Sequence, residues 1–107
     1  MDLEPLTISA RIELLSAAEG GRKKALHGPI SYRPNHNFFG KDDREMCMGT
    51  IELTDRQSLA PGEAMNLDMT LWLWPALARE VDIGRRWRIQ EGEQLVGWGT
   101  VLSKVAE

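Results

Sequence analysis

The chain has 107 residues, a length typical of one domain that buries its own hydrophobic core. Its 13 basic and 16 acidic residues give a net charge of -3, so binding of a phosphate backbone would need a local basic patch. The single cysteine, Cys47, excludes an intramolecular disulfide and a paired metal site. No apolar run approaches the roughly 18 residues of a membrane span. We therefore expect a cytoplasmic protein without membrane contact, metal or cofactor.

Alternation of apolar and polar side chains predicts β-strands along most of the chain. Residues 6–15 place Ile8, Ala10, Ile12 and Leu14 on one face, and residues 64–74 form the longest alternating run. Shorter strands are predicted at 28–34, 46–53, 86–90 and 95–104, and a short helix at 76–84. Residues 16–24 read as a turn, and 35–45 as a long irregular loop. The sequence predicts an all-β domain, 1–107, with about six antiparallel strands that close into a barrel.

Two glycines in the last predicted strand, Gly97 and Gly99, leave one of its faces without side chains. This pattern is typical of a sharp bend or of a close approach by another backbone.

Six motifs in order make the chain similar to the third, C-terminal β-barrel domain of bacterial elongation factor Tu. They are LLSAAEGGR (14–22), YRP (32–34), GTIEL (49–53), PGE (61–63), IQEG (89–92) and VGWG (96–99). The resemblance implies a six-stranded antiparallel barrel. The GTP-binding domain and second barrel of that family have no counterpart in these residues, and no nucleotide-binding fingerprint occurs. We expect no nucleotide binding and no GTP hydrolysis.

The same resemblance implies a surface for a tRNA stem. It assigns this role to Arg22, Asn35, Glu91 and Gly92, with Asn35 standing where the family usually has glutamine. Met48 replaces a family threonine and cannot make its hydrogen bond. Two basic clusters also suit RNA, one at residues 22–24 and one formed by Arg85, Arg86 and Arg88. RNA binding is therefore the second functional hypothesis.

Large apolar side chains at outward positions favour a protein interface instead. Tryptophan is enriched in interface cores, and methionine in adaptable binding surfaces. The alternative for the methionines is a cover formed by Phe38 and Phe39 of the long loop. The first functional hypothesis is a non-catalytic module that binds a protein partner, or a second copy of itself, in a translation-related or other complex. Its candidate interface residues are Met46, Met48, Trp72, Trp74 and Trp98.

A catalytic site is the third and most remote hypothesis. His36 shares the long loop with Asp42 and Asp43, which suggests a small hydrolase-type site, but their spacing matches no ligand motif. A loop histidine that bonds to solvent is the ordinary interpretation. Cys47 alternates onto the same side as Ile51, as a buried apolar residue would. We expect no catalytic residue in this chain.

Overall fold

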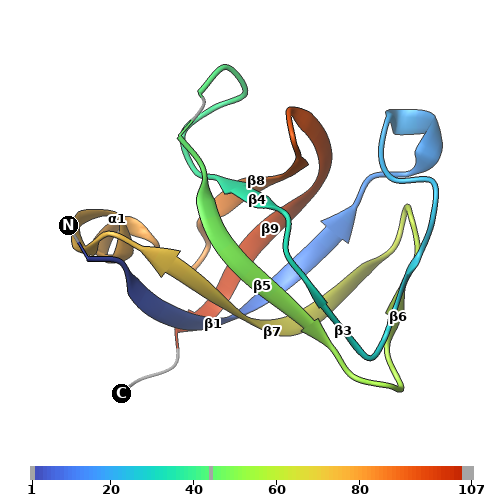
Figure 1. Ribbon diagram of the computed structural model, residues 1–107, viewed down its shortest axis with the longest axis horizontal. Helices are drawn as coiled ribbons and strands as arrows, with labels where there is room; N and C mark the ends of the chain where they lie inside the picture. Colours follow the sequence, from blue (N-terminus) through green and yellow to red (C-terminus); the bar gives the residue numbers. More distant parts are fainter. Residues whose placement is uncertain (1, 44, 105–107) are drawn as a thin grey trace.

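The computed structural model describes residues 2–43 and 45–104 and shows a closed antiparallel β-barrel with one extra strand (Figure 1). The elements in chain order are β1 (Glu4–Leu14), the 3-10 turn η1 (Ala17–Glu19), β2 (Leu26–His27), β3 (Ile30–Tyr32), β4 (Asn35–Asn37), β5 (Cys47–Leu53), β6 (Ser58–Leu59), β7 (Ala64–Leu73), α1 (Pro75–Glu80), β8 (Arg86–Glu91) and β9 (Gln94–Lys104).

The barrel closes through six strands in the order β4, β8, β9, β1, β7 and β5, and β5 pairs back onto β4. β3 lies against β5 just before β4, while β2 and β6 form a separate two-stranded ribbon. The predicted all-β class and the six-stranded antiparallel barrel are confirmed. In the described part of the chain, no helix is long and apolar enough to cross a membrane.

The alternation read from the sequence defines the inside of the barrel. Because successive side chains of a strand point to opposite faces, one row of each strand fills the core and the other faces outward. Ala10 of β1 lies opposite Leu67 of β7 within the longest pairing of the barrel. The inward rows of these two strands are buried: Ile8, Ala10, Ile12 and Leu14 in β1, and Leu67, Met69, Leu71 and Leu73 in β7.

Gly97 and Gly99 are required by close approaches inside the barrel. A Cβ atom at Gly97 would lie 2.4 Å from the carbonyl oxygen of Glu13 on β1. A Cβ atom at Gly99 would lie 2.3 Å from the indole ring of Trp87, the largest fully buried side chain. The predicted close backbone approach is therefore confirmed at Gly97, and at Gly99 the neighbour is a side chain.

The bounds of the predicted helix and the assignment of residues 35–45 as a loop are wrong. The helix begins at Pro75 and ends at Glu80, because the next residue, Val81, is extended and fully buried. The predicted loop at 35–45 contains a barrel strand, since Asn35–Asn37 pairs with both β5 and β8. A strand of three residues is too short to show an alternating pattern of apolar and polar side chains.

Gly99→Ala should lower the free energy of unfolding by about 1–3 kcal/mol, because the added methyl group overlaps the buried Trp87 ring. Urea denaturation measures this loss. Gly40→Ala is the matched control, since no atom lies within 4 Å of its added methyl group, and a similar loss in both variants would contradict the packing argument.

Candidate functional site

His36 is buried inside the barrel and is fully bonded there. Its Nδ1 accepts a hydrogen bond from the Nε1–H of Trp87 at 2.9 Å. Indole nitrogen only donates, so His36 carries its proton on Nε2 and donates it to the carbonyl of Gly49 at 3.2 Å. Burial lowers the pKa of His36 to about 4, which keeps the ring neutral at pH 7. The expected loop histidine bonded to solvent is therefore wrong.

The histidine and the acidic pair of the remote hydrolase hypothesis are not combined in one site. Asp42 and Asp43 line a groove of about 280 Å³ at the surface, whereas His36 is 0% exposed and has both ring nitrogens occupied. Among the described residues, no group of three metal-ligating side chains could hold an ion. Cys47 is buried as expected, and burial, with a smaller effect of Glu45, raises the pKa of its thiol to about 11.

Arg22 and Glu91 meet at one end of the barrel. The Glu91 carboxylate accepts hydrogen bonds from the Arg22 guanidinium and from the Tyr32 hydroxyl. The guanidinium also lies over the Tyr32 ring, 5.2 Å from its centroid. Burial and the bond to Glu91 raise the pKa of Tyr32. The charge of Arg22 is thus neutralised within the protein.

The structure separates the four expected tRNA contacts into two places. Arg22 and Glu91 line a groove of about 330 Å³ together with Lys23 and Lys24. Gly92 follows Glu91 in the β8–β9 hairpin with a φ of +61°. Asn35 instead lies on the outer side of β4, opposite Met48, and lines a different groove.

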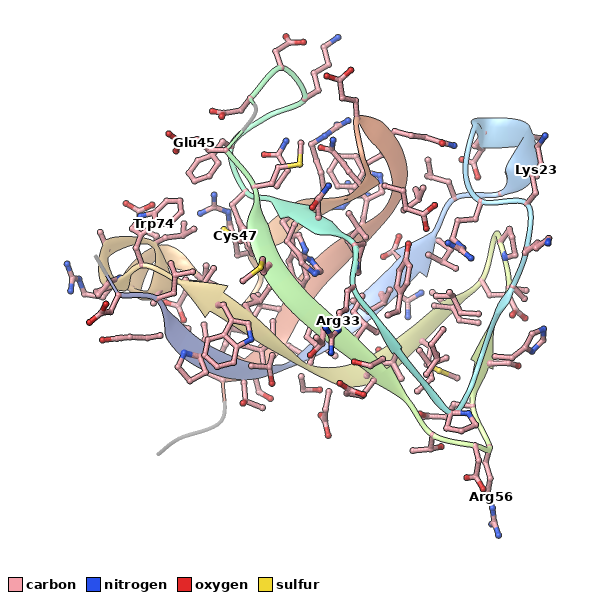
Figure 2. The ribbon with its side chains drawn as sticks, in the orientation of Figure 1. Lys23, Arg33, Glu45, Cys47, Arg56 and Trp74 are labelled. Atoms are coloured by element: carbon pink, nitrogen blue, oxygen red, sulfur yellow. The ribbon has the colours of Figure 1, made fainter. Side chains whose placement is uncertain are left out.

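This second groove combines two exposed apolar side chains with a cation. Met48 and Trp72 lie directly opposite each other on β5 and β7 and are 64% and 40% exposed. Together with Arg33, Pro34, Asn35, Gly49 and Thr50 they line a groove of about 390 Å³, which we call the Met48–Trp72 groove. Figure 2 shows Arg33 beside β3 and β5. The outward orientation predicted for Met48 and Trp72 is confirmed.

Phe38 and Phe39 do not cover the exposed methionine. Phe38 stacks on Trp87 at 5.3 Å between ring centroids, and Phe39 stacks on Trp74 at 5.8 Å. The alternative of a phenylalanine cover is therefore wrong for Met48. Met46 differs from Met48, because it is half-buried and lines the groove that contains Asp42.

The tryptophans do not form one aromatic surface. Trp74 packs on Phe39 beside α1, at the opposite end of the molecule from Lys23 (Figure 2). Trp98 is half-buried on β9, and two guanidiniums lie over its ring, that of Arg86 at 4.1 Å and that of Arg88 at 5.4 Å. Across the shared neighbour β1, Trp72 lies opposite Pro5 and Trp98 lies opposite Glu13, so the two tryptophans are near opposite ends of that strand.

Arg33 is a groove residue that the sequence analysis did not single out. It lies between Tyr32 and Pro34, both of which are buried. Alternation from the buried tyrosine would have placed the Arg33 side chain outward, so the signal was present in the three residues of the YRP motif.

No model of a known protein family matches the sequence.

Stability should fall in mild acid because His36 is buried as a neutral ring. Its pKa is about 4 in the folded protein and near 6.5 when unfolded, so between these values only the unfolded state takes up the proton. From pH 7 to pH 5 this removes about 2 kcal/mol from the free energy of unfolding. Urea denaturation at both pH values measures the loss.

His36→Gln should be less stable at pH 7 and should lose less stability between pH 7 and pH 5. His27→Gln is the control, because His27 is exposed, and it should keep the wild-type dependence. An equal loss in the wild type and in His36→Gln would show that other groups cause the acid sensitivity.

Proposed function

We propose that this chain is a non-catalytic binding domain that recognises a protein partner through the Met48–Trp72 groove. The observation that carries the proposal is the direct cross-strand pair of Met48 and Trp72, exposed on the barrel wall over a groove of about 390 Å³. Exposed apolar side chains that share one groove favour an interaction site over a plain surface.

The residues around this pair indicate the chemistry of the partner. Pro34, Met48 and Trp72 offer apolar contact, and tryptophan is among the residues that contribute most to binding energy. Arg33 lies at the same groove, and none of its described lining residues is acidic. A partner segment that presents an apolar side chain next to a carboxylate fits both features.

The similarity to the elongation factor barrel supports a binding role of translation-factor descent. It also supports the second candidate, binding of a tRNA stem. The observation that favours this candidate is the groove of Arg22, Lys23 and Lys24 at the β8–β9 hairpin. The ion pair between Arg22 and Glu91 counts against it, because one of the three cations is already neutralised.

Peptides selected from a random library against the domain should carry an aromatic or leucine residue beside Asp or Glu. Trp72→Ala should weaken their binding at least about tenfold, as expected for the centre of an interface. Arg33→Gln should remove the preference for the acidic residue. Fluorescence anisotropy with the selected peptides measures both effects.

Ile83→Ala is the matched control, because Ile83 is 68% exposed but lies outside the groove. Sedimentation equilibrium of the wild type and of Trp72→Ala shows whether the partner is a second copy of the chain. Peptides that bind Trp72→Ala as tightly as wild type, together with no self-association, would exclude the groove as the binding site.

The second candidate predicts salt-sensitive binding of bulk tRNA that Lys23→Gln and Lys24→Gln both weaken. Each lost phosphate contact should make the dependence of log K on log salt shallower by roughly 0.7–0.9. Arg56→Gln is the control, since Arg56 is exposed at a distant turn (Figure 2). Binding that both lysine variants retain would exclude this groove as the tRNA site.

A further inference from the structure

We propose that a third surface, on β8 and β9, binds single-stranded nucleic acid. It is a groove of about 300 Å³ whose accessible side chains are two aromatic rings and three cations. We call it the Arg–Trp groove, and its key residues are Phe39, Lys41, Arg86, Arg88 and Trp98. The proposal goes beyond the protein-binding role and concerns a different face of the barrel.

The groove is basic in a chain that is acidic as a whole. Lys41, Arg86 and Arg88 line it, and no carboxylate lines it within residues 2–43 and 45–104. Neither arginine forms an ion pair with a described residue. Both guanidiniums lie against one indole, at 4.1 and 5.4 Å from its centroid, so two cations share a single tryptophan. A phosphate bound at this site would neutralise charge that pairs with no described carboxylate.

The arginines are held in place. Arg88 lies opposite Trp98 in the pairing of β8 and β9, and its Nε donates to the Gln90 side chain at 3.3 Å. The same Gln90 oxygen accepts from Asn37 at 2.9 Å inside the barrel. The Arg86 guanidinium makes a cation–π contact with the Trp98 ring, 4.1 Å from its centroid. Cations that are already positioned lose less conformational entropy when a ligand binds.

The aromatic groups of the groove suit nucleobases. Phe39 is 41% exposed and stacks on Trp74, and Trp98 is half-buried with the Arg86 guanidinium 4.1 Å from its ring centroid. Bases of single strands stack on aromatic rings and on the planes of arginine side chains. An acidic peptide would satisfy the cations but would make no use of the exposed part of Phe39 or of the guanidinium planes. A duplex hides the faces of its bases, so an unpaired strand fits best.

The neighbouring surface limits the path of the strand. Arg86 and Trp98 also border a separate groove on the side of β1, which is lined by Glu13, Glu19 and Glu63. Arg11 pairs with Glu13 there at 3.2 Å, and the remaining carboxylates repel phosphates. A bound strand is therefore directed along β8 toward Lys41, away from β1.

The test measures binding of fluorescein-labelled oligouridine and oligothymidine, each of about 12 nucleotides, by fluorescence anisotropy at several salt concentrations. Wild-type protein should bind with a slope of log K against log salt of roughly -2, as three neutralised phosphates require. Arg86→Gln/Arg88→Gln should bind at least about tenfold more weakly, with a slope shallower by about 1.4.

Trp98→Leu separates stacking from charge. It should weaken binding at least about fivefold and leave the salt slope unchanged, because it removes a stacking surface and no cation. Arg56→Gln is the control, because it removes an exposed cation that lies outside the Arg–Trp groove, and it should bind as wild type does. Urea denaturation at pH 7 confirms that each variant is folded.

Three results would overturn the proposal. The first is the absence of oligonucleotide binding at about 50 mM salt. The second is equal binding by the wild type and Arg86→Gln/Arg88→Gln. The third is competition by polyphosphate or polyglutamate of matched charge as strong as that by the oligonucleotide, which would indicate plain anion exchange at this groove.

Discussion

The hydrogen bond from Trp87 to His36 is the constraint on which much of this barrel depends. The Trp87 ring of β8 packs against Gly99 of β9, where the missing side chain leaves room for it. Its indole nitrogen donates a hydrogen bond to the His36 ring of β4. His36 in turn donates to the carbonyl of Gly49 on β5. One continuous set of buried contacts therefore links four strands and closes the barrel where β4 is only three residues long. Because each polar atom of this set is bonded, it specifies one arrangement of the core.

The outer surface follows from this inner network. With the Gly49 carbonyl held by His36, the neighbouring residues of β5, Met48 and Thr50, are fixed at the groove on the barrel wall. The same bond joins β4 to β5, and the pairing of these strands places Asn35 opposite Met48. A Cβ atom at Gly49 would lie 2.8 Å from the His36 ring, so the network also requires glycine there. A surface built on rigid strands is presented with little loss of entropy on binding.

Two faces of the barrel have different chemistry. The strands β5 and β7 carry the Met48–Trp72 groove, and β8 and β9 carry the Arg–Trp groove, with β1 and β4 between them on either side (Figure 1). The Met48–Trp72 groove combines apolar side chains with a single arginine, and the Arg–Trp groove is cationic and aromatic. A net charge of -3 conceals this division, because no described carboxylate lines either groove, whereas Glu13, Glu19 and Glu63 line another one. Under the two proposals, the domain joins a protein to a nucleic acid strand through separate faces of the barrel.

The sequence by itself determined five of the six barrel strands and their inward rows, because a two-residue period is a local property of the chain. It also indicated the outward Met48 and Trp72 and the crowding at Gly97. Only the tertiary structure decided that β4 exists, that His36 is buried, and that Arg22 is neutralised by Glu91. It likewise placed Trp72, Trp74 and Trp98 in different environments. These properties depend on residues that lie far apart in the chain and meet across strands. Trp87 and His36 are 51 positions apart, and Arg22 and Glu91 are 69 positions apart. Arg88 and Trp98, which pair across β8 and β9, are 10 positions apart. Burial and pairing between such residues arise from barrel closure, which no local pattern records.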